Sequence, residues 1–294
     1  MLVSRLCIIG VGLIGGSLAL ALKKAGAVGH VVGCGRGTRN LQRAAELGVI
    51  DEYTTNPAEA AEGADVVLLA VPLGANESVM TQLRTALGKT TILTDVGSAK
   101  RCVIEAARQV FGAIPSNFVA GHPIAGNEQS GAEAAFDSLY QDHRVILTPT
   151  EETDADALAR VRSMWQVAGA EVLTLDADHH DQVLAATSHL PHMLAYALVD
   201  TLGRLDEQTE IFRYAAGGFR DFTRIASSDP TMWHDICIAN RDALLVALRR
   251  FQADLQDMTD AIERADSEVI REVFTRAKLT RDAHVGSIKL DVDG

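Results

Sequence analysis

The most constraining feature of the chain is a glycine-rich segment close to its N-terminus. "GVGLIG", Gly10 to Gly15, follows the apolar run "RLCII" and opens the helical pattern "LIGGSLALALKK". A strand, a glycine turn and a helix in this order are the fingerprint of a dinucleotide-binding unit. Gly10 permits the tight turn, Gly12 lets a pyrophosphate approach the backbone, and Gly15 lets helix and strand pack closely. The alternative is a glycine turn without a ligand.

The first half of the chain alternates short β-branched runs with helical patterns. This alternation predicts an α/β fold, a doubly wound parallel sheet with helices on both faces. The runs that we expect to be strands or strand ends are residues 5–10, 30–34, 65–72, 90–97, 117–123, 144–150 and 170–175.

After Leu175 no strong strand pattern recurs. "DADHHDQVLAATSHLPHMLAYALVDTLGRL" predicts a helix interrupted at Pro191. Asp229 and Pro230 have the N-cap and first-turn chemistry of a helix start, and one long apolar stripe follows as far as Ile262. We therefore expect a dinucleotide-binding domain at 1–175, an all-helical domain at 176–285 and a short tail at 286–294.

Charge and composition exclude several classes of partner. The chain has 294 residues and a formal net charge of −12, which argues against nucleic acid or an anionic membrane as the partner. No apolar run reaches the roughly 18–20 residues that span a bilayer, and the N-terminus lacks a signal-peptide pattern. The four cysteines are widely separated and form no C-x-x-C pair, which favours reduced thiols in a cytoplasmic protein.

The end of the second predicted strand, "VVGCGRGTRN", bears on the choice of cofactor. An NAD-binding unit normally carries Asp or Glu here to bind the ribose 2′-hydroxyl. The position near Gly35 has no carboxylate, and Arg36, Thr38 and Arg39 follow it. Arginine binds a 2′-phosphate that a carboxylate would repel, so NADP is favoured over NAD. The alternative is that both arginines belong to a solvated helix start.

Two polar residues follow predicted strands at the edge where ligands of such sheets gather. His122 lies between Gly121 and Pro123, an order that predicts a loop, and histidine is the usual proton acceptor near neutral pH. Ser98 follows the strand in "TTILTDVG". The structural alternatives are a histidine that holds loop backbone and a serine that caps a helix starting at Ala99.

The helical half contains two further groups of candidates. His189 and His192 are three residues apart and would share a helix face, but no third ligand is placed for a metal, so we predict none. "GGFRDFTRIASSDPTMW" carries Arg220 and Arg224 in a short irregular stretch. It is either a solvated loop or a site that recognises a substrate carboxylate.

These pieces together resemble the prephenate/arogenate (cyclohexadienyl) dehydrogenase family of tyrosine biosynthesis. The resemblance covers roughly residues 5 to 285. It rests on "IIGVGLIGGSLALALK", "ELGVIDEYTT", "DVVLLAVP", "TDVGSAK", "GHPIAGNEQSG", "VILTPT", "SHLPHMLAYALVD" and "GGFRDFTRIASSDPTMW". It implies a Rossmann-type domain followed by a helical domain through which two chains form a homodimer.

The resemblance also implies roles for individual residues. His122 hydrogen-bonds the ring 4-hydroxyl of the substrate and assists its deprotonation, and Ser98 orients that hydroxyl and the nicotinamide. Arg224 binds a substrate carboxylate. The other residues implied in the substrate pocket are His192, Glu128 and Trp233. The residues expected to bind the cofactor are Gly10, Gly12, Leu13, Ile14, Gly15, Arg36, Thr38, Arg39, Val71 and Pro72.

The implied reaction is oxidative decarboxylation of prephenate, arogenate or both, with hydride transfer to NAD(P) and no metal. An arogenate-specific, NADP-dependent enzyme is one variant of this interpretation. Another alternative is a different two-domain dehydrogenase, such as a 3-hydroxyacid dehydrogenase or a pyrroline carboxylate reductase relative. A third is a sensor that binds the dinucleotide without catalysis. The other dehydrogenases would be expected to carry a catalytic lysine or another motif set in place of "GHPIAG" and "SHLPH". A sensor would not need His122, Ser98 and Arg224 together.

Overall fold

The computed structural model describes residues 1–126, 129–206 and 208–284. The chain folds as two compact units, Met1–Leu244 and Leu245–Gly294. At the domain boundary predicted near residue 175, the structure changes from strands and helices to helices alone. The predicted boundary itself stays a prediction.

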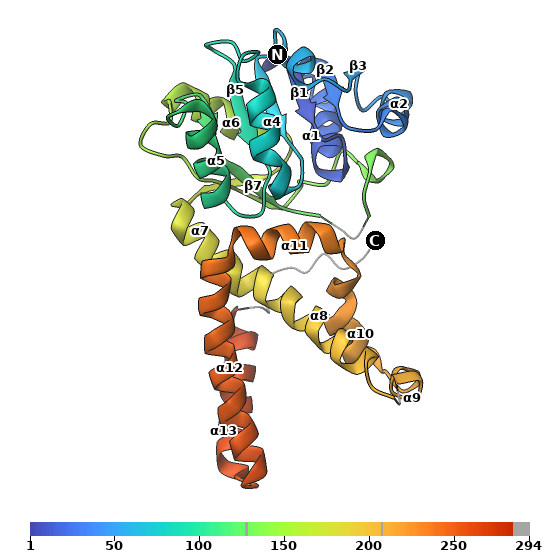
Figure 1. Cartoon of the computed structure of the whole chain (residues 1–294), viewed down its shortest axis with the longest axis vertical. Helices are drawn as coiled ribbons and strands as arrows, with labels where there is room; N and C mark the ends of the chain where they lie inside the picture. The colour runs from blue at the N-terminus through green and yellow to red at the C-terminus, as the bar shows by residue number, and fades with distance from the viewer. Residues whose placement is uncertain (127–128, 207, 285–294) are drawn as a thin grey trace. The chain divides into compact units, whose positions relative to one another are not determined.

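A six-stranded parallel sheet forms the centre of the first unit (Figure 1). Its spatial order is β3-β2-β1-β4-β5-β6 and every neighbouring pair is parallel. This order is that of dinucleotide-binding sheets and confirms the predicted fold class. The strands are β1 (Val3–Ile9), β2 (Val28–Cys34), β3 (Glu52–Thr54), β4 (Val66–Leu69), β5 (Ile92–Asp95) and β6 (Phe118–Val119).

Both faces of this sheet are buried. On β1, Leu6 and Ile8 belong to the apolar cluster on one face. Cys7 and Ile9 belong to the cluster on the other face. This period of two is what a strand covered by helices on both sides requires. The covering helices are α1 (Leu13–Lys24), α2 (Thr38–Glu46), α3 (Pro57–Ala61), α4 (Asn76–Leu83), α5 (Arg101–Phe111) and α6 (Ala155–Val167).

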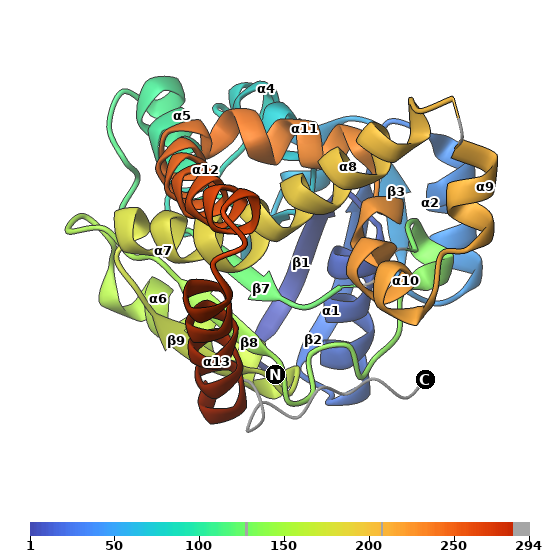
Figure 2. The ribbon, with the colours of Figure 1, turned by 90° about the horizontal axis from the view of Figure 1, so that it is seen from below.

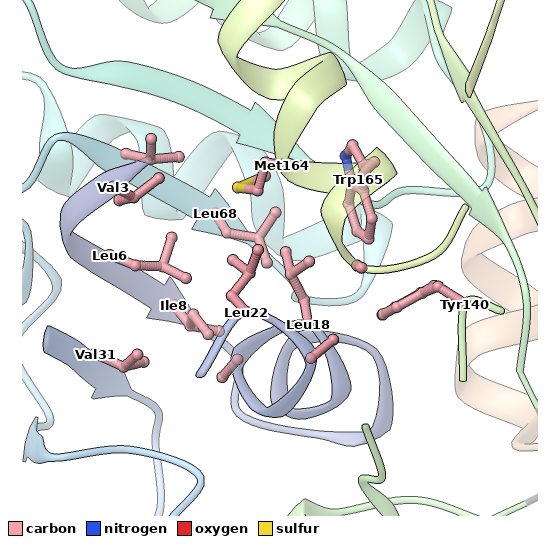
Figure 3. Close-up of a cluster of buried hydrophobic side chains, with 14 of the residues drawn as sticks. Val3, Leu6, Ile8, Leu18, Leu22, Val31, Leu68, Tyr140, Met164 and Trp165 are labelled. Atoms are coloured by element: carbon pink, nitrogen blue, oxygen red, sulfur yellow. The ribbon is translucent and has the colours of Figure 1, made fainter. Parts of the chain in front are cut away.

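Figure 3 shows the core between the sheet, α1 and α6. Leu18 and Leu22 of α1 face Leu68 of β4, and Met164 and Trp165 of α6 close the cluster. All five side chains are fully buried. Because α6 lies between β8 and β9 in the chain, this core joins the parallel sheet to the segments that follow it.

A second, three-stranded sheet corrects one prediction. Its order is β7-β8-β9, where β7 (Gly121–Ile124) is antiparallel to β8 (Arg144–Leu147) and β8 is parallel to β9 (Glu171–Thr174). His122 therefore lies on a strand and not on the predicted loop. Pro123 is tolerated because β7 is an edge strand, where a missing N–H need not break the sheet.

The remainder of the first unit is helical, as predicted. Its helices are α7 (Ala177–Leu184), α8 (Leu190–Gly203), α9 (Gln208–Arg213), α10 (Gly217–Thr223) and α11 (Pro230–Ala239). Figure 2 shows α8 and α11 side by side, and the stacked rings of His192 and Trp233 join them. Asp229 caps α11 through the backbone N–H of Met232, which confirms the predicted helix start.

The predicted interruption at Pro191 lies elsewhere. Pro191 is in the first turn of α8, and the irregularity is a π-helical turn just before it, Ala185–His189. Pro191 cannot donate to the carbonyl four residues earlier and its ring crowds that carbonyl, so the preceding turn widens. His189 is the last residue of the widened turn and is buried, and His192 follows, half-buried, in the first turn of α8.

The long apolar stripe is likewise divided between two helices. α11 ends at Ala239, Asn240 leaves helical geometry with ψ of 30°, and α12 (Arg241–Glu263) begins directly afterwards. Side-chain hydrogen bonds of Asn240 to α7 and to His189 account for the break. The second unit contains most of α12 and then α13 (Ser267–His284). No helix within the described ranges is long and apolar enough to cross a membrane.

Candidate active site

The glycine segment forms a turn at the carboxyl end of β1. Gly10 has a φ of +100°, and a Cβ at this position would lie 2.2 Å from the carbonyl oxygen of Ala70. Its N–H donates to the carbonyl of Cys34 at 2.8 Å, which ties the turn to the end of β2. A Cβ on Gly15 would lie 2.7 Å from Cγ2 of Ile8. Both glycines are therefore required by the protein's own packing and geometry.

Gly12 differs from these two glycines because nothing in the protein requires it. Its φ of −123° is open to any residue, and a Cβ there would meet no protein atom within 4 Å. Gly12 is also the N-cap of α1, whose first turn contains Leu13 and Ile14. Backbone N–H groups at a helix start bind phosphate oxygens, and glycine lets a diphosphate approach them. The loop thus fits the diphosphate of a dinucleotide.

The cofactor candidates that follow β2 lie beside this loop. Arg36, Thr38 and Arg39 are all exposed, and Thr38 is the first residue of α2. Because Gly10 is bonded to Cys34, the last residue of β2, the arginines follow the strand end that adjoins the glycine turn. No carboxylate lies between positions 35 and 39.

The end of β4 borders the same loop on its other side. Ile9 pairs with Leu69, so β1 and β4 end at the same level of the sheet. Val71 and Pro72 follow, and Cγ1 of Val71 lies 3.2 Å from the Cβ position of Gly10. The structure therefore brings the cofactor candidates from three strand ends together.

Asn40 of α2 links the glycine loop to the segment between β7 and β8. Its Nδ2 donates to the carbonyl of Val11 at 2.7 Å, and its Oδ1 accepts the N–H of Ala132 at 3.1 Å. The hydroxyl of Tyr140 donates to the carbonyl of Ile14 at 2.5 Å. The chain that leaves the strand of His122 is thus anchored to the nucleotide loop at both of these points.

A buried ion pair fixes the strand of His122 against the end of β5. The Nζ of Lys100 donates to Oδ2 of Asp95 at 2.5 Å and to the carbonyl of Gly121 at 2.6 Å. The other carboxylate oxygen of Asp95 accepts the N–H of Gly121 at 3.1 Å. Both side chains are fully buried. Removing either partner would leave an uncompensated charge, so this pair holds Gly121 firmly in place.

Ser98 lies between Asp95 and Lys100 in the sequence, and its side chain is half-buried. The alternative prediction that it caps a helix starting at Ala99 is wrong. The helix α5 starts at Arg101, and no side chain within it serves as its cap. Instead, Asp181 of α7 accepts the N–H groups of Lys100 and Arg101, at 2.8 and 3.1 Å.

His122 is the first member of a buried chain of three side chains. Its Nδ1 lies 2.9 Å from Nε2 of His180, and Nδ1 of His180 lies 2.8 Å from Oδ1 of Asp181. The two rings meet edge-on with centroids 5.1 Å apart. His122 is 8% exposed, and His180 is fully buried. Among the described residues, Nε2 of His122 has no hydrogen-bond partner.

The surroundings keep His122 neutral. Burial lowers its pKa well below the usual value, and the proximity of His180, Lys100 and His189 lowers it further. Burial alone would raise the pKa of Asp181, but hydrogen bonds from His180 and from two backbone N–H groups lower it. The result is a neutral imidazole at one end of the chain and a carboxylate at the other.

His189 is a second buried neutral histidine. Burial lowers its pKa to about 4, while the Asp181 carboxylate acts in the opposite direction. The Nδ2 of Asn240 donates to the carbonyl of Asp181 at 2.8 Å and lies 3.0 Å from Nδ1 of His189. Because the carbonyl can only accept, this Asn240 atom is the amide nitrogen. His189 must therefore accept at Nδ1 and carry its proton on Nε2.

The predicted substrate-binding residues His192, Trp233 and Arg224 also come together. The rings of His192 and Trp233 are stacked with centroids 3.6 Å apart. Burial lowers the pKa of His192, and the positive charge of Arg224 lowers it as well. Nδ1 of His192 donates to the carbonyl of Ser188 at 2.9 Å. Arg224 is exposed and starts a 3₁₀ turn after α10.

We use the term histidine cluster for His122, His180, His189 and His192. The rings of His189 and Trp233 have centroids 6.2 Å apart, which connects the two ends of the cluster. Glu128 lies outside the described residues. Within the part of the chain that is described, no group of three or more His, Cys, Asp and Glu side chains is arranged to hold a metal ion.

Sequence reasoning missed His180, Asp181, Asn240 and Lys100. One signal was available for His180, because it lies four residues before Leu184 and so shares the apolar face of α7. A histidine on such a face must find a polar partner when it is buried. No local pattern indicates that this partner is His122, 58 residues earlier in the chain.

Two family models and several known proteins match this chain. The family model of the prephenate dehydrogenase nucleotide-binding domain matches residues 18–174. The model of the prephenate dehydrogenase dimerization domain matches residues 176–276. The cyclohexadienyl dehydrogenase of Zymomonas mobilis is 39% identical over 94% of both chains.

Solved structures give the same result. Prephenate dehydrogenase from Aquifex aeolicus, in complex with hydroxyphenyl propionate and NAD⁺, is 37% identical with a TM-score of 0.89. The match covers 95% of this chain and 97% of that one. Synechocystis arogenate dehydrogenase is 28% identical with a TM-score of 0.79, over 95% and 99% of the two chains. With both domain models matched in order along it, this chain belongs to the prephenate dehydrogenase family of NAD(P)-dependent oxidoreductases.

Proposed function

We propose that the protein catalyses oxidative decarboxylation of prephenate, arogenate or both, giving 4-hydroxyphenylpyruvate or tyrosine. The observation that carries this proposal is His122. It is buried, its pKa is lowered, and the segment that follows its strand is anchored to the nucleotide loop. A neutral imidazole in that position is suited to accept a proton from an alcohol that is being oxidised. Family relatives that act on prephenate and on arogenate support both substrates.

The proposed chemistry uses few groups. Both substrates are cyclohexadienes with a carboxylate on C1 and a hydroxyl on C4. Nicotinamide, when bound, accepts the hydride from C4. His122 takes the hydroxyl proton as the C4–O bond gains double-bond character. The C1 carboxylate leaves as CO₂, its bonding electrons enter the ring, and the proton returns to the phenol oxygen. Because the ring becomes aromatic, the protein mainly positions the substrate and holds one proton.

We propose binding roles for the residues around His122. Arg224 binds a carboxylate of the substrate, and His192 and Trp233 line the same pocket on the helical side. Ser98 orients the hydroxyl and the nicotinamide. This assignment is supported by the stacking of His192 on Trp233 and by the electrostatic influence of Arg224 on His192. Glu128 stays a predicted pocket residue.

The decisive experiment is incubation with prephenate or arogenate and with NAD or NADP, in four combinations. We expect at least one pair to produce reduced cofactor together with CO₂. Lack of turnover with all four pairs would show that the protein is not this enzyme. The ratio of kcat/KM for the two substrates then measures the substrate preference.

Arg224→Ala tests the substrate-binding side of the proposal. We expect KM for the substrate to rise about 10- to 100-fold, because a charge-assisted hydrogen bond to the carboxylate is lost. Arg220→Ala is the matched control, since Arg220 is exposed on the preceding helix and has no assigned role. An unchanged KM in Arg224→Ala, or an equal rise in both variants, would contradict the carboxylate contact.

We further propose that NADP is the preferred cofactor. The support is the exposed group Arg36, Thr38 and Arg39, at a strand end without a carboxylate. These side chains can bind a 2′-phosphate, and nothing at the same positions repels it. The Aquifex aeolicus relative was solved with NAD⁺, so relatives alone do not decide this preference.

We also propose that two chains form a homodimer through the helical half. The family model matched there is a dimerization domain. In the second unit, large apolar side chains are exposed along both helices, and they are Val246, Leu255, Ile262, Val269, Phe274 and Leu279. Light scattering should give the mass of two chains, and a single-chain mass would refute the proposal. The cytoplasmic location stays a prediction.

A further inference from the structure

We propose that His180 and Asp181 are positioning residues that fix the protonation state of His122. In this arrangement His122 carries its proton on Nδ1 and keeps Nε2 as the proton acceptor. The inference deepens the proposed function, because it assumes that His122 is the base of that reaction. Its geometric basis is the chain of two hydrogen bonds, of 2.9 and 2.8 Å, that joins the three side chains.

The direction of each hydrogen bond follows from the acceptor at the end of the chain. The Asp181 carboxylate can only accept, so His180 donates from Nδ1. At a pH where imidazoles are ordinarily neutral, Nε2 of His180 then has a lone pair and accepts from His122. His122 therefore carries its proton on Nδ1 and keeps a lone pair on Nε2. That lone pair is what a substrate hydroxyl requires of a general base.

Asp181 is held so that it cannot turn away from His180. Its two oxygens accept the N–H groups of Lys100 and Arg101 at the start of α5. Asn240 binds the backbone carbonyl of the same residue. The start of a helix also favours a negative charge. The carboxylate is thus fixed by two N–H groups at the start of α5, its backbone is held by Asn240, and it in turn fixes the ring of His180.

During turnover His122 becomes an imidazolium, and His180 is the group that binds it. The other ionisable groups near these hydrogen-bonded side chains do not compete for that role. Lys100 is neutralised by Asp95 at 2.5 Å, and burial lowers the pKa of His189 to about 4. When His122 takes a proton on Nε2, its Nδ1–H continues to donate to His180. Asp181 stabilises that charge through the His180 ring. Without the hydrogen bonds to His180 and Asp181, neither tautomer of His122 would be favoured. The imidazolium would also lack the stabilising carboxylate.

The first test measures protonation directly and needs no turnover. The protein labelled with ¹⁵N-histidine is studied by two-dimensional NMR that correlates ring nitrogens with ring protons, at about pH 8.5, where imidazoles are ordinarily neutral. The His122→Asn and His180→Phe variants assign the two rings. We expect a protonated Nδ1 and an unprotonated Nε2 on both rings. A proton on Nε2 of His122, or an unprotonated Nδ1 on His180, would overturn the inference.

The second test uses a disruptive and a conservative variant of His180. His180→Phe keeps a ring of similar size but removes the acceptor, and we expect kcat to fall about 10- to 100-fold with KM little changed. His180→Gln offers an amide oxygen to Nδ1–H of His122, and we expect it to recover part of kcat and the Nδ1–H tautomer. His179→Phe, an exposed neighbour on α7, is the matched control and should behave as wild type.

The outcomes separate this inference from the proposed function. If wild type turns over but His180→Phe and His180→Gln are equally impaired or equally active, the positioning role is refuted. If wild type turns over none of the four substrate and cofactor pairs, the proposed function fails, and the NMR result still decides the tautomer. If His180→Phe does not fold, the wild-type spectrum and the Gln variant decide the matter alone.

Discussion

The glycine loop at residues 10–15 and the histidine cluster are built in opposite ways. In the loop, consecutive residues form the site, and the backbone supplies the groups that face a ligand. In the cluster, side chains from β7, α7, the π-helical turn and α8 meet. His122 is aligned by His180, 58 positions away, and His189 by Asn240, 51 positions away. A locally built site depends on a few glycines. A site assembled from distant segments depends on every residue that aligns it.

His122→Asn should have the largest effect and tests whether the cluster is chemical or structural. We expect kcat to fall about 10²- to 10⁴-fold with a modest change in KM, because a general base is lost. Asn retains an amide that can pair with His180, so the midpoint of thermal unfolding should stay close to that of wild type. A large loss of stability with unchanged kcat would mean that His122 only holds the two segments together.

Gly10→Ala and Gly12→Ala form a matched pair within the loop. Gly10→Ala should lower the free energy of unfolding by about 2–4 kcal/mol, because its Cβ would lie 2.2 Å from a carbonyl oxygen at a φ of +100°. Gly12→Ala should leave stability unchanged but weaken NAD(P) binding, because its Cβ meets no protein atom within 4 Å. Chemical denaturation and cofactor titration separate the two effects. Equal stability in both variants would contradict the loop geometry.

The difference between the two regions also explains what the sequence could predict. The loop, its strand and α1 follow from a contiguous pattern of apolar residues and glycines. The same holds for most of the parallel sheet, because each buried strand shows its period within a few residues. β7 was mistaken for a loop because Gly121 and Pro123 are usually strand breakers, and only the sheet order shows that this strand is at an edge.

The hydrogen-bond partners of the histidine cluster could not be predicted from local sequence patterns. Asp181 caps a helix from another element, and Asn240 breaks the apolar stripe between α11 and α12 in order to reach His189. These contacts link residues separated by 51 or more positions. Their pairing depends on how the segments pack, and residue type alone does not determine it. The sequence therefore identified the catalytic candidate but not the residues that hold it.

Acid should destabilise the first unit through the histidine cluster, and the loop should add nothing to this pH dependence. His189 has a pKa of about 4 in the folded chain and an ordinary value of 6.5, so the unfolded state binds more protons between these limits. Stability is therefore full above about pH 6.5 and falls as the pH drops toward 4, by up to about 1.4 kcal/mol per pH unit. The lowered pKa of His122 adds to this trend. Residues 10–15 contain no titratable side chain.

The acid prediction is checked by urea unfolding at several pH values. His189→Gln should flatten the dependence between about pH 6.5 and 4. The exposed His179→Gln variant on α7 should keep the slope of wild type. The lowered pKa of Asp181 does not interfere, because that carboxylate's contribution is lost only below its ordinary value of 3.8. Identical slopes in all three proteins would show that His189 is not buried as a neutral ring.

Arg36→Ala should have the smallest effect and sharpens the comparison at the edge of the loop. Here a side chain, and not the backbone, is expected to decide between two cofactors. We expect the Kd for NADP to rise about tenfold more than the Kd for NAD, because an exposed guanidinium contributes modestly to binding a 2′-phosphate. Arg43→Ala is the control on α2, since Arg43 is already paired with Glu133 at 2.8 Å and Glu46 at 3.1 Å. Calorimetric titration of both cofactors measures the ratio, and equal changes for the two would remove the argument for NADP.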